Sequence, residues 1–518
     1  MTKIKTFILC CFLWMVTFVY AGDVNVEAYG AKGDGVTLNT KAIQNAIDAC
    51  GQQGGGRVVV PKGDFLSGTV EFKNHVVLYL QKGARLLGSS RIEDYRNPDP
   101  FTEGLGIDVG WALLAAVDCH DIGIEGAGVI DGQGSKLKAT QIMTDQRPEA
   151  KRWGRRPFLL RVVRCNGVSV KGITLQYAAA WTSHYARSRN VNIQGVKIVS
   201  VGVAHNDGIG IDGCQDVHIS DCDVTSGDDA LVFKTTSSKM ACRNIVVSHM
   251  RLKSNQAGIK IGTESMADFE NISIRDCYIY DTKNGGIKLL SVDGARIKNV
   301  RISGINMQQV RTPLLLRLGS RLSVFRKGRD QRQQTGSFEN VVLKDIIAVS
   351  ADSTQLKSAT GILITGVPGH PVSGVMLKNI FIDLPGGGMA DEAAAVVPEA
   401  IEKYPEVKTF GPVIPAYGLW ARHVRDLKME SIRFRLRRND ARPVLVLEDA
   451  TGVALRNFSV PYTKGPVTGI VRTSKQVKIE GWKVAGGAPV FLNTDSISRW
   501  QLRLHANRLP VGQQTINL

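Results

Sequence analysis

The chain has 518 residues, of which 43% are hydrophobic, 22% are charged and 7% are aromatic. This apolar content excludes an intrinsically disordered protein, because it provides enough surface to build a core. The 54 glycines follow no triplet period, which excludes collagen and indicates many turns. Basic residues outnumber acidic ones by 65 to 47, and the net charge of +18 favours a polyanionic partner: nucleic acid, anionic lipid or an acidic polysaccharide.

The N-terminus has the pattern of a secretory signal peptide. Two lysines precede an apolar run from Phe7 to Val19, and Val19-Tyr20-Ala21 resembles a cleavage site. The run is shorter than the roughly 20 residues of a membrane span, and no later stretch reaches about 18 apolar residues. We therefore expect cleavage after residues 1–21 and a soluble, secreted or periplasmic protein of residues 22–518, whose net charge falls from +18 to +16 with the loss of both lysines. An uncleaved anchor or a buried helix is the alternative.

A repeat with alternating apolar positions runs through most of the remaining chain. Its early copies begin at a polar residue, and later copies begin near Asn340, Gly374, Asp426, Gly452 and Gln476. Alternation at period two predicts strands with one buried face. A unit of about 25 residues has to stack on its neighbours to bury that face. The regular early copies start at Asn166, Asn190, Asp216, Asn244, Asn271 and Asn299.

These repeats predict an all-β protein, a single-domain right-handed parallel β-helix in which each repeat is one coil. A β-propeller is the competing fold, but its blades need about 40–50 residues each. Asn39 or Thr40 can cap a helix that carries Ile43 and Ile47 on one stripe, and this helix is expected to cover the N-terminal end of the coil. Wider spacings predict insertions at about 319–338 and 385–424.

Seven cysteines follow residue 21, and none lies in a pattern with the spacing of a zinc site. Their number is odd, and several lie beside apolar residues within the repeats. They are therefore interpreted as buried thiols rather than a disulfide framework. We expect neither a metal nor a cofactor.

Stacked coils place equivalent positions about 4.8 Å apart, so a residue that recurs once per repeat forms a column. Aligning Asp207-Gly-Ile-Gly-Ile with Asp229-Ala-Leu-Val-Phe puts Asp207 and Asp229 in one column, with Asp228 beside them. Carboxylates this close repel one another, so some of their pKa values must rise. Glycosidic bond hydrolysis needs an acid for the leaving oxygen and a base for water. A turn-capping cluster or a calcium site explains the same three residues equally well.

The segment His205-Asn-Asp-Gly-Ile-Gly-Ile-Asp-Gly-Cys214, followed by Ser226-Gly-Asp-Asp-Ala230, resembles the first two motifs of glycoside hydrolase family 28, the polygalacturonase family. The glycine-rich opening of the chain is similar to that of the pectate-lyase-like superfamily. The resemblance covers nearly all of the chain after residue 21. It implies an inverting hydrolase in which Asp228 is the general acid, while Asp207 and Asp229 activate water.

Several positions depart from the family pattern. The family usually has Asn where His205 stands, and often Asp where Gly210 stands. Its Gly-His-Gly motif falls on Gln256-Ala257-Gly258, and its Arg-Ile-Lys motif falls on Lys288-Leu289-Leu290. In the family, the missing histidine and cation pair tune the acid and hold a galacturonate carboxylate. The departures imply that the sugar at the cut differs from galacturonate in plain pectate, or is held differently.

A second column is expected beside the acids. Lys260 and Lys288 align on adjacent coils, and Arg317 is expected to continue the column on the next coil. These three cations, together with His205 and Trp181, are the candidate substrate-binding residues. Each cation fits a solvated strand face about as well, and Trp181 fits plain packing slightly better than stacking on a sugar.

These features predict a monomeric, secreted, inverting hydrolase of a pectin-like acidic polysaccharide, either a polygalacturonase or a rhamnogalacturonan-type hydrolase. One alternative is a polysaccharide lyase that cuts by β-elimination with a calcium-bound carboxylate and an Arg or Lys base. The other is a non-catalytic, carbohydrate-binding β-helix. The three aspartates favour hydrolysis over both. A nucleic acid partner is not expected, because export and the lack of a readout motif oppose it.

Overall fold

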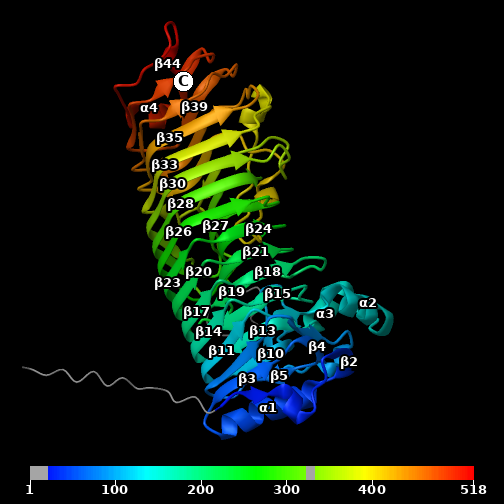
Figure 1. The fold of residues 1–518 in the computed structure, drawn as a ribbon. Coiled ribbons are helices and arrows are strands. Elements are labelled where there is room, and N and C mark those ends of the chain that lie inside the picture. Colours follow the sequence, from blue (N-terminus) through cyan, green and yellow to red (C-terminus); the bar gives the residue numbers. More distant parts are fainter. Residues whose placement is uncertain (1–21, 323–332, 518) are drawn as a thin grey trace, which may run out of the picture.

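The computed structural model describes residues 22–322 and 333–517. The predicted signal peptide and the middle of the first predicted insertion lie outside the described residues. The strands stack along one axis, from helix α1 (Thr40–Gln52) at one end to strand β44 (Gln514–Asn517) at the other (Figure 1). Successive coils pair in parallel register, which confirms the predicted right-handed parallel β-helix.

One face of the helix is a sheet of 16 strands that carries the candidate site. Its strands are β5 (Val70–Glu71), β10 (Ala112–Val117), β13 (Phe158–Val163), β16 (Ser183–Ala186), β19 (Ile209–Asp212), β22 (Leu231–Thr235), β25 (Ala257–Ser265), β27 (Gly285–Ser291), β29 (Leu314–Leu318), β31 (Ile362–Thr365), β32 (Val372–Ser373), β34 (Leu419–Arg425), β36 (Leu445–Thr451), β39 (Val467–Arg472), β42 (Val490–Thr494) and β44. Each strand adds a rung to the same surface, except that β31 and β32 both pair with β34 and share one rung.

The remaining faces form a connected sheet of 26 strands. In the N-terminal half these are β1 (Val24–Asn25), β2 (Asp34–Leu38), β3 (Gly56–Val60), β4 (Gly63–Ser67), β6 (Val76–Leu80), β7 (Ala84–Gly88), β11 (His120–Gly126), β12 (Val129–Asp131), β14 (Asn166–Lys171), β15 (Thr174–Gln176), β17 (Arg189–Gln194), β18 (Lys197–Ser200), β20 (Gln215–Ser220), β21 (Asp223–Ser226), β23 (Cys242–Ser248) and β24 (Arg251–Ser254). In the C-terminal half they are β26 (Phe269–Tyr280), β28 (Arg296–Val310), β30 (Ser337–Ser350), β33 (Val375–Leu384), β35 (Lys428–Leu436), β37 (Ala454–Arg456), β38 (Ser459–Val460), β40 (Val477–Glu480), β41 (Lys483–Val484) and β43 (Leu502–His505).

A polar residue with left-handed backbone turns the chain at the start of each of several coils. Asn190, Asp216, Asn244, Asn271 and Asn299 have φ angles between 52° and 57°. Asn and Asp tolerate this conformation better than other residues with a Cβ atom. Their side chains also stack, because Nδ2 of Asn271 donates to Oδ1 of Asn244 at 3.1 Å, and Nδ2 of Asn299 donates to Oδ1 of Asn271 at 3.0 Å. The repeat positions read from the sequence are therefore bends of the coil.

Helix α1 covers the N-terminal end of the apolar core, as predicted, with Ile43 and Ile47 fully buried. Asn39 precedes the helix, but its side chain makes no cap hydrogen bond to the first turn; its Oδ1 instead accepts the Lys32 N–H at 2.7 Å. The capping role expected for Asn39 is therefore wrong. The seven cysteines of the described residues are buried thiols, and none of them forms a disulfide.

The second predicted insertion leaves the coil after β33 and contains the short helices η4 (Ala390–Ala394) and η5 (Val407–Phe410). It spans 385–418 rather than 385–424, because the chain from Leu419 onward forms β34 and pairs with β31 and β36. It also contacts the described part of the first insertion, since the Ser320 N–H donates to the Ile401 carbonyl at 2.9 Å.

Two excursions from the coil were not predicted. One is the antiparallel hairpin of β8 (Phe101–Thr102) and β9 (Asp108–Val109). The other contains α2 (Gly134–Thr144), α3 (Glu149–Arg152) and η3 (Trp153–Arg155), and it projects from the side of the stack in Figure 1. The remaining helices are η1 (Val26–Tyr29), η2 (Ile92–Asp94) and α4 (Ser496–Trp500). Across residues 22–322 and 333–517, none of the helices has both the length and the apolar character that crossing a membrane requires.

Candidate active site

Three aspartates meet where β19 and β22 begin. The register pairs Ile209 with Leu231, and Asp207 and Asp229 each lie two residues before these positions. The sequence alignment of the two coils is therefore confirmed, and the two aspartates belong to one column. Asp228 stands immediately before Asp229, at the end of the turn that leads into β22.

The turn that presents Asp228 is held through its backbone. The Asp228 carbonyl accepts hydrogen bonds from Oγ of Ser226 and Oγ of Ser254, each at 2.6 Å. Gly227 packs against a buried amide, because a Cβ atom at this position would lie 2.2 Å from Oδ1 of Asn206. Glycine is therefore needed here, because a side chain at this position would collide with Asn206.

Asp228 has the surroundings of a proton donor. Burial raises its pKa to about 8, and the negative charges of Asp207 and Asp229 act in the same direction. Its Oδ1 accepts the Asp229 N–H at 2.9 Å. The side chain lines a cavity of about 290 Å³. A protonated carboxyl therefore faces a space in which a glycosidic oxygen can bind.

Asp229 and Asp207 are each paired with a buried lysine. Nζ of Lys260 donates to Oδ2 of Asp229 at 2.7 Å, and Nζ of Lys234 lies 3.1 Å from Oδ2 of Asp207. Burial would raise the pKa of Asp229, but the charges of Lys260, Lys288 and Lys234, together with the hydrogen bond from Lys260, lower that pKa. For Asp207, burial outweighs the charge of Lys234, and the pKa is raised. The cluster therefore contains a protonated acid beside an ionised carboxylate, the combination that acid–base cleavage requires.

The predicted cation column is correct for two residues and wrong for the third. Lys260 lies opposite Lys288, as expected. Lys288 in turn lies opposite Leu315, while Arg317 lies opposite Leu290, so Arg317 is two positions beyond the column. The coil from Lys288 to its partner Leu315 spans 27 residues, whereas Arg317 lies 29 residues after Lys288. Arg317 is 1% exposed and donates to two backbone carbonyls of the second insertion at 2.8 and 3.0 Å, so it anchors that insertion.

The second insertion contributes Tyr404, Glu406 and Lys408 to the wall of the cavity. Oη of Tyr404 accepts from Nζ of Lys260 at 3.1 Å, and Oε2 of Glu406 accepts from Nζ of Lys288 at 3.1 Å. These residues were not predicted from the sequence. The segment follows no repeat, and Glu406 lies 118 residues after Lys288. No spacing rule connects it to the coils.

Two further buried carboxylates lie beside Lys234. Its Nζ is 3.9 Å from Oε2 of Glu264, and its charge, with that of Arg321, lowers the pKa of Glu264 against the effect of burial. Glu103 comes from the β8–β9 hairpin, and burial together with the charge of Glu264 raises its pKa to about 7. Lys234, Glu264 and Glu103 were all missed from the sequence. Lys234 could have been identified from the sequence, because the strand that contains it directly follows the three aspartates.

His205 and Trp181 have different surroundings. His205 lines the cavity and stacks on Trp153 with ring centroids 4.2 Å apart. Burial and the nearby charge of Lys234 lower the pKa of His205 to about 4, so its ring is neutral near pH 7. Trp181 is 5% exposed, and Nζ of Lys234 lies 3.8 Å from its ring centre. A sugar cannot stack on this covered face, so the expectation that Trp181 binds substrate is wrong; it supports Lys234.

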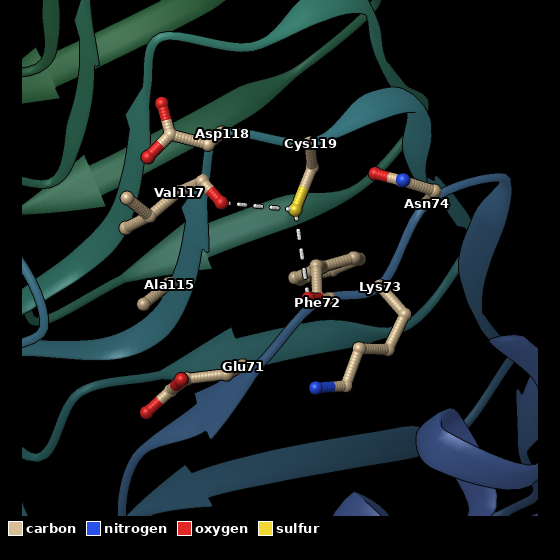
Figure 2. A pocket seen from close by; sticks show the side chains of 8 residues that line it. All are labelled: Glu71, Phe72, Lys73, Asn74, Ala115, Val117, Asp118 and Cys119. Carbon is tan, nitrogen blue, oxygen red and sulfur yellow. Dashed lines mark hydrogen bonds between the residues drawn. The ribbon is translucent and has the colours of Figure 1, made fainter.

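A second cavity, of about 270 Å³, lies near the N-terminal end (Figure 2). Figure 2 shows Cys119, whose thiol hydrogen-bonds to the backbone oxygens of Val117 and Phe72. None of the candidate site residues lines this cavity. In the part of the chain that the structure describes, no three His, Cys, Asp or Glu side chains are arranged to hold a metal ion.

Comparison with known proteins supports a glycosidase. Residues 50–400 match the sequence model of the family described as Glycosyl hydrolases family 28. A "Probable polygalacturonase" of Vitis vinifera is 26% identical over 394 residues, which cover 70% of this chain and 75% of the relative. An endo-polygalacturonase of Pectobacterium carotovorum subsp. carotovorum is 26% identical over 302 residues, or 55% of this chain and 73% of the relative. The fold matches that of a family 28 exopolygalacturonase of Yersinia enterocolitica, with a TM-score of 0.64 and 20% identity over 84% of this chain and 78% of that one.

Proposed function

The chain belongs to glycosyl hydrolases family 28 and is a glycoside hydrolase, and on that basis we propose that it cleaves a pectic polysaccharide with inversion at the anomeric carbon. The observation that carries this proposal is the aspartate cluster. Asp228 is held protonated at the wall of a cavity, next to the ionised Asp229 and to Asp207. A lyase or a purely structural β-helix has no need for carboxyls held in different protonation states.

In the proposed reaction, Asp228 donates its proton to the glycosidic oxygen as the C–O bond breaks. Asp207 and Asp229 orient a water molecule and take its proton as the oxygen attacks the opposite face of the sugar. Inversion needs the acid and a base carboxyl about 6.5–9.5 Å apart, so that this water fits between them. One water is consumed, and each product gains a hydroxyl group. Lys260 acts as a positioning residue, because it keeps Asp229 ionised.

The substrate that we propose is an acidic pectic chain of branched or rhamnogalacturonan type rather than plain polygalacturonate. The net charge of +16 after loss of the signal peptide attracts a polyanion at long range. The N-terminal signal pattern fits a protein that acts on such a substrate outside the cell or in the periplasm. Inside the cavity the situation differs, because Lys260 and Lys288 already contact protein carboxylates. The net positive charge of the protein therefore attracts the acidic chain as a whole. The sugar at the scissile bond is recognised by groups other than Lys260 and Lys288.

The test compares wild type with Asp228→Asn on polygalacturonate, rhamnogalacturonan oligosaccharides and neutral glycans, at low and high salt. We expect a loss of at least about 10²-fold in rate for the variant, with an unchanged circular dichroism spectrum. Proton NMR of the fresh product should show the inverted anomer. A retained anomer or an unsaturated product would refute the mechanism, and fast random cutting of polygalacturonate would refute the substrate. Binding without turnover would favour the non-catalytic alternative.

A further inference from the structure

The buried cations of the site are already matched by carboxylates of the protein. Three lysines, Lys234, Lys260 and Lys288, lie within 4 Å of four buried or half-buried carboxylates, Asp207, Asp229, Glu264 and Glu406. Arg321, on the neighbouring insertion, forms a two-bond pair with Asp293 at 2.9 and 2.6 Å. A uronate that enters the cavity therefore finds Lys260 and Lys288 already paired with Asp229 and Glu406.

Glu406 is the carboxylate that pairs with Lys288. Its side chain is 18% exposed, whereas that of Lys288 is 2% exposed. Its Oε2 contacts both Nζ of Lys288 and Nδ2 of Asn284. Burial would raise its pKa, but the charges of Lys288 and Lys260 lower it, so the group is ionised. Glu406 therefore takes the place against Lys288 that the carboxylate of a bound uronate would otherwise occupy.

The other groups at this end of the cavity are suited to hydroxyls. Gln256, Asn284 and Gln355 present amides, and Tyr404 presents a phenol. Lys408 also lines the cavity, but its side chain is exposed, so solvent and salt screen its attraction for an anion. Placing a second carboxylate beside Glu406 in a half-buried site costs repulsion and desolvation. A sugar hydroxyl instead donates to Glu406 and makes a charge-assisted hydrogen bond.

We propose that Glu406 is a specificity-determining residue that excludes a uronate from this cavity and selects a neutral sugar next to the scissile bond. The inference rests on the proposed hydrolysis of an acidic pectic chain, and it identifies the uncharged unit of that chain as the one bound at the cut. The insertion at 385–418 thus sets specificity by supplying a carboxylate that mimics the one it excludes.

The test uses two oligosaccharides with the same linkages that differ only at C6 of the sugar bound in the cavity, a primary alcohol in one and a carboxylate in the other. Wild type should show a kcat/KM at least tenfold higher for the neutral compound. In Glu406→Gln the charge of Lys288 is released, and this preference should shrink at least tenfold. Glu402→Gln, an exposed position of the same insertion, is the matched control and should keep the wild-type ratio. A wild-type preference for the carboxylate, or an unchanged ratio in Glu406→Gln, would overturn the inference.

A second variant separates recognition from folding. Lys288→Met removes the cation and leaves Glu406 charged, so the preference for the neutral compound should increase. If Glu406 and Lys288 only held the insertion in place, both variants would slow both substrates by the same factor, which would also overturn the inference. Calorimetry with Asp228→Asn measures binding of the two compounds without turnover. Preferential binding of the neutral compound, together with an inactive wild type, would refute the hydrolysis but support the selectivity; binding of neither would refute the selectivity.

Discussion

Replacing Asp228 with asparagine should stabilise the folded protein at neutral pH while it removes activity. The pKa of Asp228 is about 8 in the folded state, against an ordinary value of 3.8. Between these two pH values the unfolded chain releases this proton and the folded chain keeps it. The folded state then binds more protons, so the contribution of this group to stability is complete below about pH 4 and is lost as pH rises toward 8. Asparagine cannot ionise, and its Oδ1 can still accept the Asp229 N–H.

The size of the effect follows from the interval between the ordinary pKa and pH 7, roughly 3 pH units at about 1.4 kcal/mol each. The upper limit is therefore about 4 kcal/mol, and the partial exposure of Asp228 reduces it to about 2–4 kcal/mol. The entropy of unfolding of a chain of this length is about 1 kcal/mol/K, so the expected gain in Tm at pH 7 is about 2–4 °C.

The assay is thermal unfolding followed by circular dichroism at pH 4, 5, 6, 7 and 8. The gap between Asp228→Asn and wild type should be close to zero at pH 4 and should widen steadily toward pH 8. Asp221→Asn removes an exposed carboxylate of the same coil, and it should change stability by less than about 0.5 kcal/mol. A gap that does not vary with pH, or a variant that is less stable at every pH, would show that Asp228 is not held protonated by its surroundings.

Three further predictions concern the same site. The alkaline limb of the kcat profile should have an apparent pKa of about 8, because activity is lost as Asp228 ionises; a limb near pH 5 would contradict its role as the acid. Lys260→Met removes the counter-charge of Asp229 and should raise its pKa. The acidic limb of the kcat profile should then move to higher pH, and kcat should fall at least about tenfold. An acidic limb at the wild-type pH would contradict the pairing of Lys260 with Asp229. Gly227→Ala should destabilise the protein by about 1–3 kcal/mol, since its Cβ would meet Asn206 at 2.2 Å, and an unchanged Tm would contradict this contact.

The coil and the three aspartates could be predicted from the order of residues alone. Both depend on periodic information: strands that alternate at period two, a polar bend about every 25 residues, and side chains that recur at the same point of adjacent coils. Asp207 and Asp229 were aligned correctly because the coil between them is regular. Arg317 was aligned incorrectly. Its strand, β29, has the sequence Leu-Leu-Leu-Arg-Leu and is buried throughout, so it lacks the alternation that identifies the register.

Which charged groups of the site pair with one another, and which carboxyls are ionised, depends on contacts between distant parts of the chain. Lys260 is recognisable in the sequence as a cation of the column, but its pairing with Asp229 depends on the distance between two coils. Glu406 reaches Lys288 because an aperiodic insertion folds back over the sheet, and insertions follow packing rather than any repeat. The same holds for the pKa of Asp228, which is high because tertiary contacts bury the carboxyl beside two others. Residue type sets which groups can ionise, while burial and neighbouring charge set which of them do.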